Sequence, residues 1–419
     1  MRLHVATVGS GRDVEHSVLF SIRESPVDCV LLLATSKTRP TAEKIAQTLE
    51  AESIPFTIEI CDEISDVNVI ARCYRRAILE AMKQYSAGPA DVAVDFTRGT
   101  KAMSAALVYV SVELGLGTMM YVNGQRDKCE QIITGTEKLV KFKPADLLFE
   151  RDFQILVRFF NTYRFSQGRE VIKEIRARYV NPLHKERMEL LDLLFEAYDA
   201  WDRFDLKRAG EIFQVLGREL KLANGRFETL KKKFVDDQGR IIQTLKENPW
   251  DREWCLAFFM AAERRHEEGR VDVAVALLYR LIEFLAHRRL KEMGYDPAGI
   301  PLERLPDSIH LAWEPYAENG ELKLGLRRSY ELLRDLGDPL GKRFLEEYQD
   351  HERPLRRALD RRNRSVLAHG TTPVAPAVYQ DLKQWVEKRL REIFGRRFKH
   401  KLERHRFPML TVELFMNAP

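Results

Sequence analysis

The chain has 419 residues, of which 45% are hydrophobic and 31% are charged, and its formal net charge is only +5 at pH 7. One hydrophobic core rarely serves a chain of this length, so two or three domains are expected. The apolar runs CVLLLAT and VAVALLYRLIEFLA are too short or too charged to span a membrane, and the first residues lack a signal-peptide pattern. We therefore expect a soluble, cytoplasmic protein.

The cysteines and the acidic residues give no sign of a metal site. The five cysteines lie far apart without a C-x-x-C pair, which favours reduced, mostly buried thiols over a disulfide framework or structural zinc. The sequence contains no H-E-x-x-H motif, no EF-hand pattern and no carboxylate pair that requires a divalent ion. We expect no bound metal.

The first 145 residues alternate between short β-branched runs and longer helical patterns. Strands are expected at 2–9, 29–35, 56–61, 91–97 and 118–124, with a last strand pattern in 131–142, and helices at 14–25, 41–52, 67–85 and 100–115. This alternation predicts a parallel, doubly wound sheet, and therefore an α/β Rossmann-like domain over residues 1–145.

The chain beyond Pro144 shows helical patterns one after another, so we expect an all-α carboxyl-terminal half. Helix breaks are predicted at SQG, NP, LANG, ENPW, EEG, GYDPAGIP and ENG. We place a helical connector at 146–250, a second functional domain at 251–400 and a tail at 401–419. The tail has a strand-like core but is too short to assign.

Two loops after strands of the first domain are suited to bind a phosphate-bearing ligand. Ligands of open α/β sheets lie beyond the carboxyl ends of the strands, where helix amino termini present backbone amides. Neither loop has a full dinucleotide or Walker A fingerprint, and Thr97 or Thr100 alone could be a helix cap. The candidate ligand residues are Gly9, Ser10, Gly11, Arg12, Thr97, Arg98, Gly99, Thr100 and Lys101.

The segment VDFTRGTKAMSAALVYVSVELG resembles the D-x-T-G-G-T-K-x-M-S-A signature of CARF domains in CRISPR-associated ribonucleases, with Arg98 where the family usually has glycine. VATVGSG is similar to the first ligand loop of that domain. The resemblance implies a homodimer that binds a cyclic oligoadenylate activator across its two-fold axis. It favours the tetra-adenylate ring over the hexa-adenylate ring, and the departure at Arg98 leaves the ring size open.

A basic segment in the second half carries the other candidate site. Between His351 and Arg406 there are 16 Lys or Arg against 6 Asp or Glu, which is a footprint expected for phosphate binding. On a helix of about 100° per residue, Arg362 and His369 in LDRRNRSVLAHGTT share one face. Alternatively, Gly370 ends the helix and the cations only favour its negative end.

The stretch RRNRSVLAHG is similar to the R-N-x-S-x-x-A-H-G motif of HEPN ribonuclease domains, which places such a domain at 251–400. GRVDVAVALLYRLIEFLAHRRL resembles the helix that packs beside the motif, with Tyr279, Arg280 and Glu283 at its centre; an ordinary ion pair is the alternative for Arg280 and Glu283. The candidate catalytic residues are His369, Arg362, Asn363 and Arg364. Helix phase favours Arg362 over Arg364 as the histidine's partner.

These motifs together imply a homodimeric endoribonuclease that an activator switches on. A histidine can move or orient a proton while the 2′-hydroxyl attacks the adjacent phosphate, and guanidinium groups stabilise the developing charge without a metal or another cofactor. We expect a single-stranded RNA substrate, no membrane contact and no stable DNA binding. The alternatives are a CARF domain that degrades its own activator beside a secondary or inactive HEPN half, and a cyclic-oligoadenylate-binding regulator.

Overall fold

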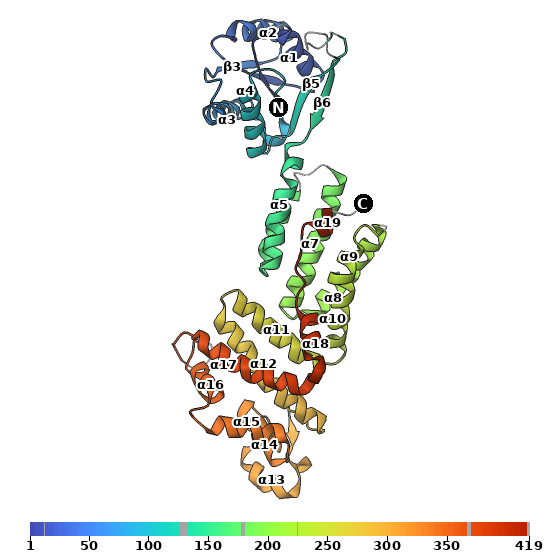
Figure 1. The fold of residues 1–419 in the computed structure, drawn as a ribbon, viewed down its shortest axis with the longest axis vertical. Coiled ribbons are helices and arrows are strands. Elements are labelled where there is room, and N and C mark those ends of the chain that lie inside the picture. The colour runs from blue at the N-terminus through green and yellow to red at the C-terminus, as the bar shows by residue number, and fades with distance from the viewer. Residues whose placement is uncertain are drawn as a thin grey trace. The chain divides into compact units, whose positions relative to one another are not determined.

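The structure is a computed structural model, and it describes residues 1–11, 13–125, 133, 135–176, 181–223, 225–366 and 370–416. The chain forms two compact units (Figure 1). The amino-terminal unit comprises Met1–Ile155 and Val171–Glu189, and the helical unit comprises Leu156–Glu170 and Leu190–Pro419. The chain passes between the units inside three helices, namely α5 (Pro144–Asn161), α6 (Phe165–Ile175) and α7 (Pro182–Asp202).

A six-stranded sheet in the order β3-β2-β1-β4-β5-β6 forms the centre of the amino-terminal unit. Its strands are β1 (Leu3–Thr7), β2 (Cys29–Ala34), β3 (Phe56–Ile60), β4 (Val92–Asp95), β5 (Thr118–Asn123) and β6 (Lys138–Phe142). Strands β1 to β5 are parallel, as expected, but β6 pairs antiparallel with β5. The sheet is therefore mixed, and the prediction of a wholly parallel sheet is wrong at this edge.

Helices cover both faces of this sheet. They are α1 (Val14–Arg23), α2 (Arg39–Ala51), α3 (Val67–Gln84) and α4 (Lys101–Glu113), and a 3-10 turn, Pro89–Asp91, precedes β4. Successive residues of β2 belong to opposite cores: Leu31 packs with α3 and α4, whereas Leu32 packs with α1 and α2. Strands covered on both sides are continuously apolar, which explains the unbroken run CVLLLA in β2.

The cysteines differ from the expectation at one pair. Cys61, at the end of β3, forms a disulfide with Cys73 of α3, and their Cα atoms lie 6.3 Å apart, within the range that a disulfide spans. The expectation of reduced thiols is therefore wrong for these two residues, because the fold brings together side chains that lie twelve residues apart in the sequence. Cys29 and Cys255 are free and buried, as expected.

The rest of the chain is mostly helical. After α7 come α8 (Leu206–Leu222), α9 (Glu228–Leu230), a π-helical turn at Lys231–Asp236, α10 (Asp237–Glu247), α11 (Glu253–Glu267), α12 (Val271–Glu292), α13 (Asp307–Trp313), α14 (Leu326–Asp335), α15 (Pro339–Gln349), α16 (Pro354–Asn363), α17 (Pro376–Phe394), α18 (Phe398–His405) and α19 (Glu413–Met416). Short 3-10 turns lie at Leu302–Arg304, Glu314–Tyr316 and Gly395–Arg397. Two short strands, β7 (Ile300–Pro301) and β8 (Glu321–Leu322), pair antiparallel, so this half is not wholly α. The strand-like pattern of the tail forms α19 instead.

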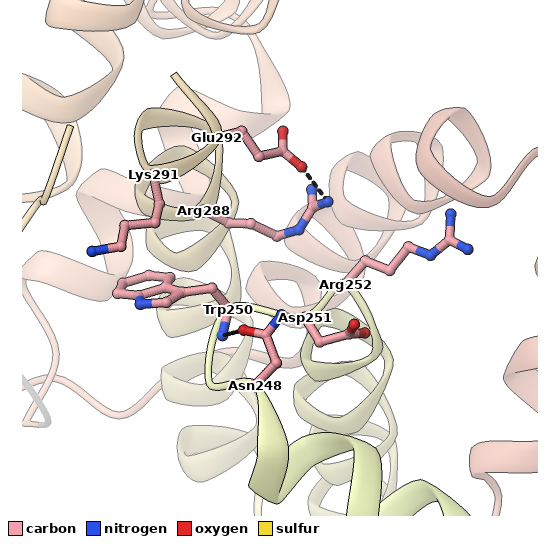
Figure 2. A pocket seen from close by; sticks show the side chains of 7 residues that line it. All are labelled: Asn248, Trp250, Asp251, Arg252, Arg288, Lys291 and Glu292. Atoms are coloured by element: carbon pink, nitrogen blue, oxygen red, sulfur yellow. Dashed lines mark hydrogen bonds and ion pairs between the residues drawn. The ribbon is translucent and has the colours of Figure 1, made fainter. Parts of the chain in front are cut away.

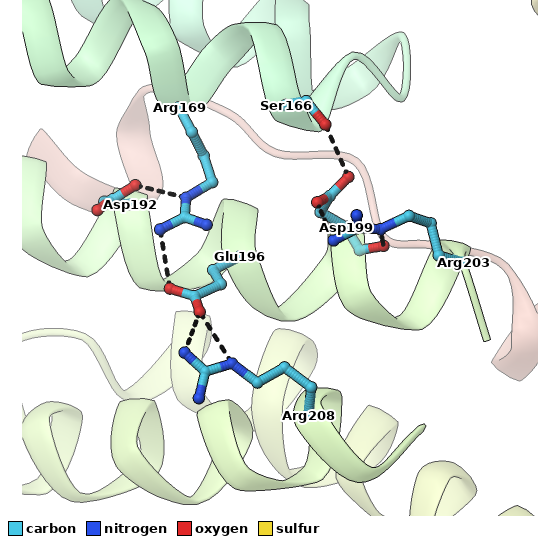
Figure 3. Close-up of polar contacts among 7 residues, drawn as sticks. All are labelled: Ser166, Arg169, Asp192, Glu196, Asp199, Arg203 and Arg208. Carbon is cyan, nitrogen blue, oxygen red and sulfur yellow. Dashed lines mark hydrogen bonds and ion pairs between the residues drawn. The ribbon is translucent and has the colours of Figure 1, made fainter. Parts of the chain in front are cut away.

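The predicted helix break at SQG is wrong, because Gly168 lies inside α6. The break comes earlier, at Tyr163, whose φ is +60°. A side-chain carbon on Gly168 would lie 2.2 Å from Cε1 of Phe195, so glycine here allows α6 to approach α7 closely. Arg169 then bridges Asp192 and Glu196 of α7 at 2.9 Å each (Figure 3).

Candidate functional site

The two predicted ligand loops lie next to each other in the amino-terminal unit. Strand β1 pairs in parallel with β4, so the loops that follow these strands leave the same edge of the sheet. A side-chain carbon on Gly9 would lie 2.5 Å from the Gly99 nitrogen, so the two backbones are in contact. The Thr7 hydroxyl donates a hydrogen bond to the carbonyl of Arg98, and the Arg98 guanidinium lies 3.5 Å from the Asp13 carbonyl.

Gly99 has a backbone conformation that side chains disfavour. Its φ is +123°, so another residue at this position would be strained. Gly99 is exposed, and so are Ser10, Gly11 and Lys101 around it. Arg12 lies outside the described residues. The exposed glycine backbone beside a hydroxyl and an ammonium group fits a site for an anionic ligand.

The hydroxyl groups of Thr97 and Thr100 are engaged within the protein. Thr97 donates to the buried carboxylate of Asp95 and accepts from the Val122 amide at 2.8 Å. Burial raises the pKa of Asp95, while hydrogen bonds from Ser21 and Thr97 act in the opposite direction. These bonds fix the start of the loop. In the described contacts, Thr97 therefore serves to shape the loop.

Thr100 is the amino-terminal cap of α4. Its hydroxyl accepts a hydrogen bond from the Met103 amide at 3.2 Å and donates to the Ile64 carbonyl at 3.0 Å. The capping role that the sequence left open is thus present in the structure. The bond to Ile64 also ties the loop after β3 to the ligand loops, so three strand ends contribute to this edge.

The predicted motif helix ends earlier than expected. Helix α16 stops at Asn363, and Ser365 forms an isolated parallel bridge with Thr372. The Ser365 hydroxyl donates to the Arg362 carbonyl at 2.7 Å and the Thr372 hydroxyl to the Arg364 carbonyl at 2.8 Å. These side chains occupy carbonyls that a longer helix would need.

The prediction that Arg362 and His369 share one continuous helical face is therefore wrong. His369 lies outside the described residues, together with Leu367 and Ala368. Gly370 follows them, and a side-chain carbon on it would lie 1.8 Å from the Arg364 carbonyl oxygen. Glycine at this position thus allows the chain to return against the end of α16, rather than only terminating a helix.

Arg362 is held on the face of an aromatic ring. Its guanidinium carbon lies 3.9 Å from the ring centroid of Tyr279 in α12, a cation–π contact, and its Nη1 lies 3.3 Å from Oδ1 of Asn363. Nε of Arg362 is shielded from solvent and has no hydrogen-bond partner among the described residues. Burial raises the pKa of Tyr279, and the Arg362 cation lowers it. The Tyr279 ring thus holds the Arg362 guanidinium in one orientation.

A hollow of about 300 Å³ lies beside this motif. Arg364 and Arg361 line it together with the segment Thr372–Ala375 and Val378 at the start of α17. Arg361 was not among the predicted site residues; it lies in the last turn of α16, three residues before Arg364, which caps this helix. Cations from this turn therefore flank the motif on two sides: Arg362 on Tyr279, and Arg361 with Arg364 at the hollow.

Arg280 and Glu283 form an ordinary ion pair. Nη1 of Arg280 lies 2.8 Å from Oε2 of Glu283 one helical turn away, and the Arg280 side chain is 44% exposed. This geometry is the alternative that the sequence left open, and exposed pairs of this kind contribute little to stability. The pair therefore gives no support to a catalytic role for either residue.

The described residues offer neither a metal cluster nor a membrane-spanning helix. They contain no group of three or more His, Cys, Asp or Glu side chains placed to hold a metal ion. In the part of the chain that the structure describes, no helix is both long and apolar enough to cross a membrane.

Comparisons with known proteins match most of the chain. Family models described as the Csm6 HEPN domain and the Csm6 6H domain match residues 255–392 and 148–240. The CRISPR system endoribonuclease Csm6 of Thermus thermophilus is 26% identical over 374 residues, covering 79% of this chain and 74% of the relative.

The fold matches over almost the full length. Enterococcus italicus Csm6 bound to cyclic hexa-2′-fluoro-hexa-dAMP superposes with a TM-score of 0.59 at 11% identity, covering 97% of this chain and 98% of that one. The fold is thus Csm6-like, with a mixed sheet at the amino end and a mostly helical half that contains a HEPN domain. Two parts of this chain thus match Csm6 domain models, and the chain is similar to Csm6 proteins of CRISPR systems in sequence and in fold.

Proposed function

We propose that this protein is an endoribonuclease of type III CRISPR defence that cleaves single-stranded RNA without a metal when a cyclic oligoadenylate binds its amino-terminal unit. One observation carries the proposal: Arg362 lies on Tyr279 beside the hollow of Arg361 and Arg364, within the range matched by the HEPN model. Three guanidinium groups at one helix end, preceding a histidine, suit a reaction at a phosphodiester.

The proposed reaction is an internal transesterification. The ribose 2′-oxygen attacks the adjacent phosphorus and loses its proton, the bond from phosphorus to the 5′-oxygen breaks, and that oxygen gains a proton. The products are a 2′,3′-cyclic phosphate and a free 5′-hydroxyl. His369 moves or orients a proton, and the Arg362 guanidinium, held on the Tyr279 ring, stabilises the charge on the phosphoryl oxygens. Arg364 and Asn363 position the strand.

The motif supplies one histidine per chain, whereas the reaction takes up and releases a proton. Two copies of the chain that face each other through their motifs would supply both groups, so we propose a homodimer with a composite site. Single-stranded RNA is the proposed substrate because in-line attack needs a backbone free to rotate.

The proposed activator site is the edge formed by the loops after β1 and β4. Its candidate contacts remain Gly9, Ser10, Gly11, Arg12, Thr97, Arg98, Gly99, Thr100 and Lys101. Gly9 lets the backbones of the two loops meet, and Gly99 and Lys101 are exposed beside this contact. Tetra-adenylate and hexa-adenylate rings both require testing, since the family resemblance favours the former and the solved relative holds a six-membered analogue.

The test is cleavage of a fluorogenic single-stranded RNA in EDTA, with each ring and without a ring. We expect cleavage with one ring, insensitive to EDTA, that His369→Ala abolishes. His351→Ala is a matched control, because His351 is exposed and lies outside the motif. Cleavage that persists in His369→Ala, or that neither ring stimulates, would refute the proposal.

A further inference from the structure

Three hollows of the helical unit share lining residues from one to the next. The first, of about 550 Å³, lies where the connection between α10 and α11 meets the end of α12 (Figure 2). It shares Asp251 and Arg252 with the second, of about 210 Å³, which reaches α18. The second shares Arg404 with the third, of about 450 Å³, which extends to Met409. We call these three neighbouring hollows together the basic groove.

Cations outnumber carboxylates along the groove. Its Lys and Arg residues are Lys233, Arg240, Arg252, Arg288, Lys291, Lys401, Arg404 and Arg406. Its Asp and Glu residues are Asp237, Asp251, Glu253, Glu292 and Glu403. A track of cations that crosses several helices attracts a polyanion more strongly than the same charges scattered over a surface.

The surplus charge is not neutralised within the protein. Arg288 pairs with Glu292, Lys291 with Asp296 and Lys401 with Glu253, each at 2.5 to 2.7 Å. By contrast, four cations of the groove have no carboxylate partner among the described residues: Lys233, Arg252, Arg404 and Arg406. These four are therefore charges available to a ligand.

An aromatic ring lines one end of the groove. Trp250 packs parallel to Phe284, with 5.7 Å between ring centroids and 6° between planes, which fixes its orientation. Arg288 and Lys291 of α12 reach over the same hollow (Figure 2). A fixed indole beside cations is the combination with which proteins bind single strands, because a base stacks on the ring while phosphates meet the cations.

Helix α17 connects the groove to the motif. Val378 lines the hollow beside Arg364 near its start, and Phe394 at its end lies under Arg252, whose guanidinium carbon is 5.6 Å from the ring centroid. At about 1.5 Å per residue, these positions lie about 24 Å apart along the helix. An RNA strand held at the motif could therefore reach the groove only if it extends several nucleotides beyond the cleaved bond.

We propose that the basic groove binds the single-stranded RNA substrate at a distance from the cleaved bond. This proposal rests on the proposed function, because it takes single-stranded RNA as the substrate. The binding surface itself is separate from the motif around Arg362. The groove then makes long RNA bind more tightly than short RNA without taking part in the chemistry.

The test measures binding of a long labelled single-stranded RNA by the full chain carrying His369→Ala, so cleavage is not needed. The groove variant carries Lys233→Glu, Arg252→Glu and Arg406→Glu, all at exposed positions. The control variant carries the same charge change at Lys207→Glu, Lys221→Glu and Arg304→Glu, exposed positions outside the groove. Equal melting temperatures of the two variants establish that both are folded.

We expect the groove variant to bind long RNA at least about tenfold more weakly. The magnitude of the slope of log K against log salt should fall by about 2, because each phosphate contact contributes about 0.7 for a single strand. The control should bind nearly as the parent does, and a short RNA covering only the cleavage site should not distinguish the variants. Equal binding by both variants, or a change in oligomeric state without a change in RNA affinity, would overturn the proposal. If the groove binds RNA but no ring stimulates cleavage, only the proposed function fails.

Discussion

His4 lies in the middle of β1 with its imidazole fully buried and its Nε2 3.3 Å from the Ser21 hydroxyl. Burial, with a smaller contribution from Lys141, lowers its pKa to about 4. In the unfolded chain the pKa returns to about 6.5, so between these values the unfolded state binds a proton that the folded state does not. The free energy of unfolding therefore falls as the pH drops below about 6.5, by about 2 kcal/mol at about pH 5.

We predict that His4→Gln lessens this acid sensitivity. The measurement is the urea midpoint of the amino-terminal unit at neutral pH and near pH 5, for the native chain and the variant. The variant is expected to be less stable at neutral pH, because a core residue has changed, but its midpoint should fall less on acidification. An identical fall in both proteins would show that the His4 imidazole does not titrate in this range.

Two glycines of the proposed activator site differ in how much space surrounds them, and this difference gives a second prediction. A methyl group on Gly9 would meet the Gly99 nitrogen at 2.5 Å, whereas one on Gly11 would meet only Cγ2 of Val14 at 3.8 Å. Backbone cannot yield as a flexible side chain can, so Gly9→Ala must push the loops apart. We expect Gly9→Ala to weaken binding of the ring at least tenfold, and Gly11→Ala to leave it nearly unchanged, by calorimetry.

The result would be informative in either direction. Equal binding by both variants would place the ring away from the contact of the two loops. Equal loss in both would indicate that Gly11 itself lies against the ligand, since the protein leaves room for its methyl group.

One cation–π contact, that of Arg362 with Tyr279, joins α16 to α12. Such contacts contribute about 1 to 2 kcal/mol when partly desolvated. If the ring orients the guanidinium for the phosphate, Tyr279→Leu should lower the cleavage rate roughly five- to thirtyfold, whereas Tyr279→Phe keeps the ring and most of the rate. Steady-state kinetics with saturating activator would measure both. A Tyr279→Phe variant as slow as Tyr279→Leu would assign the effect to the hydroxyl instead.

The elements of the amino-terminal unit follow closely from sequence pattern. Strands β1 to β5 and helices α1 to α4 lie within two residues of their expected limits, because runs such as CVLLLA suit only a strand buried on both faces. The direction of β6 was not predictable, since residue pattern shows that a strand forms but not which way it runs beside its neighbour. Gly168 suggested a helix break, but it lies inside α6, where the absence of a side chain lets α6 pack closely against Phe195, a contact that only the folded chain makes.

The geometry of the candidate site could not be predicted from the sequence. The sequence motif contains Arg362, Asn363 and Arg364 in succession, and in the structure these residues lie at the end of α16. Helical phase failed there because the hydroxyls of Ser365 and Thr372 bond to backbone carbonyls and turn the chain. The hollow that adds Arg361 is formed with α17, so no local pattern indicates it.

At the scale of the whole molecule, the proposed activator edge and the RNA motif belong to different compact units, and the chain passes between those units inside α5, α6 and α7. Coupling of two distant sites requires an element whose state both sites bias. A continuous helix is stiff, so a helix that crosses from one unit to the other is a candidate for that element. In α5 the crossing falls between Ile155 and Leu156.

The last prediction therefore concerns a variant in which α5 is less stiff at the crossing and both sites are unchanged. Gln154 and Ile155 are both exposed, so changing both to glycine removes little packing but costs the helix about 1 kcal/mol in total through propensity. Changing both to alanine shortens the same side chains while keeping the helix stiff. If α5 transmits the signal, the glycine variant should bind the ring with unchanged affinity yet show several-fold less stimulation of RNA cleavage, whereas the alanine variant is stimulated as the native chain is. The measurement is the ratio of cleavage rates with and without saturating ring. The same ratio in all three proteins would exclude α5 as the coupling element and leave α6 and α7 as the other helices through which the chain passes between the units.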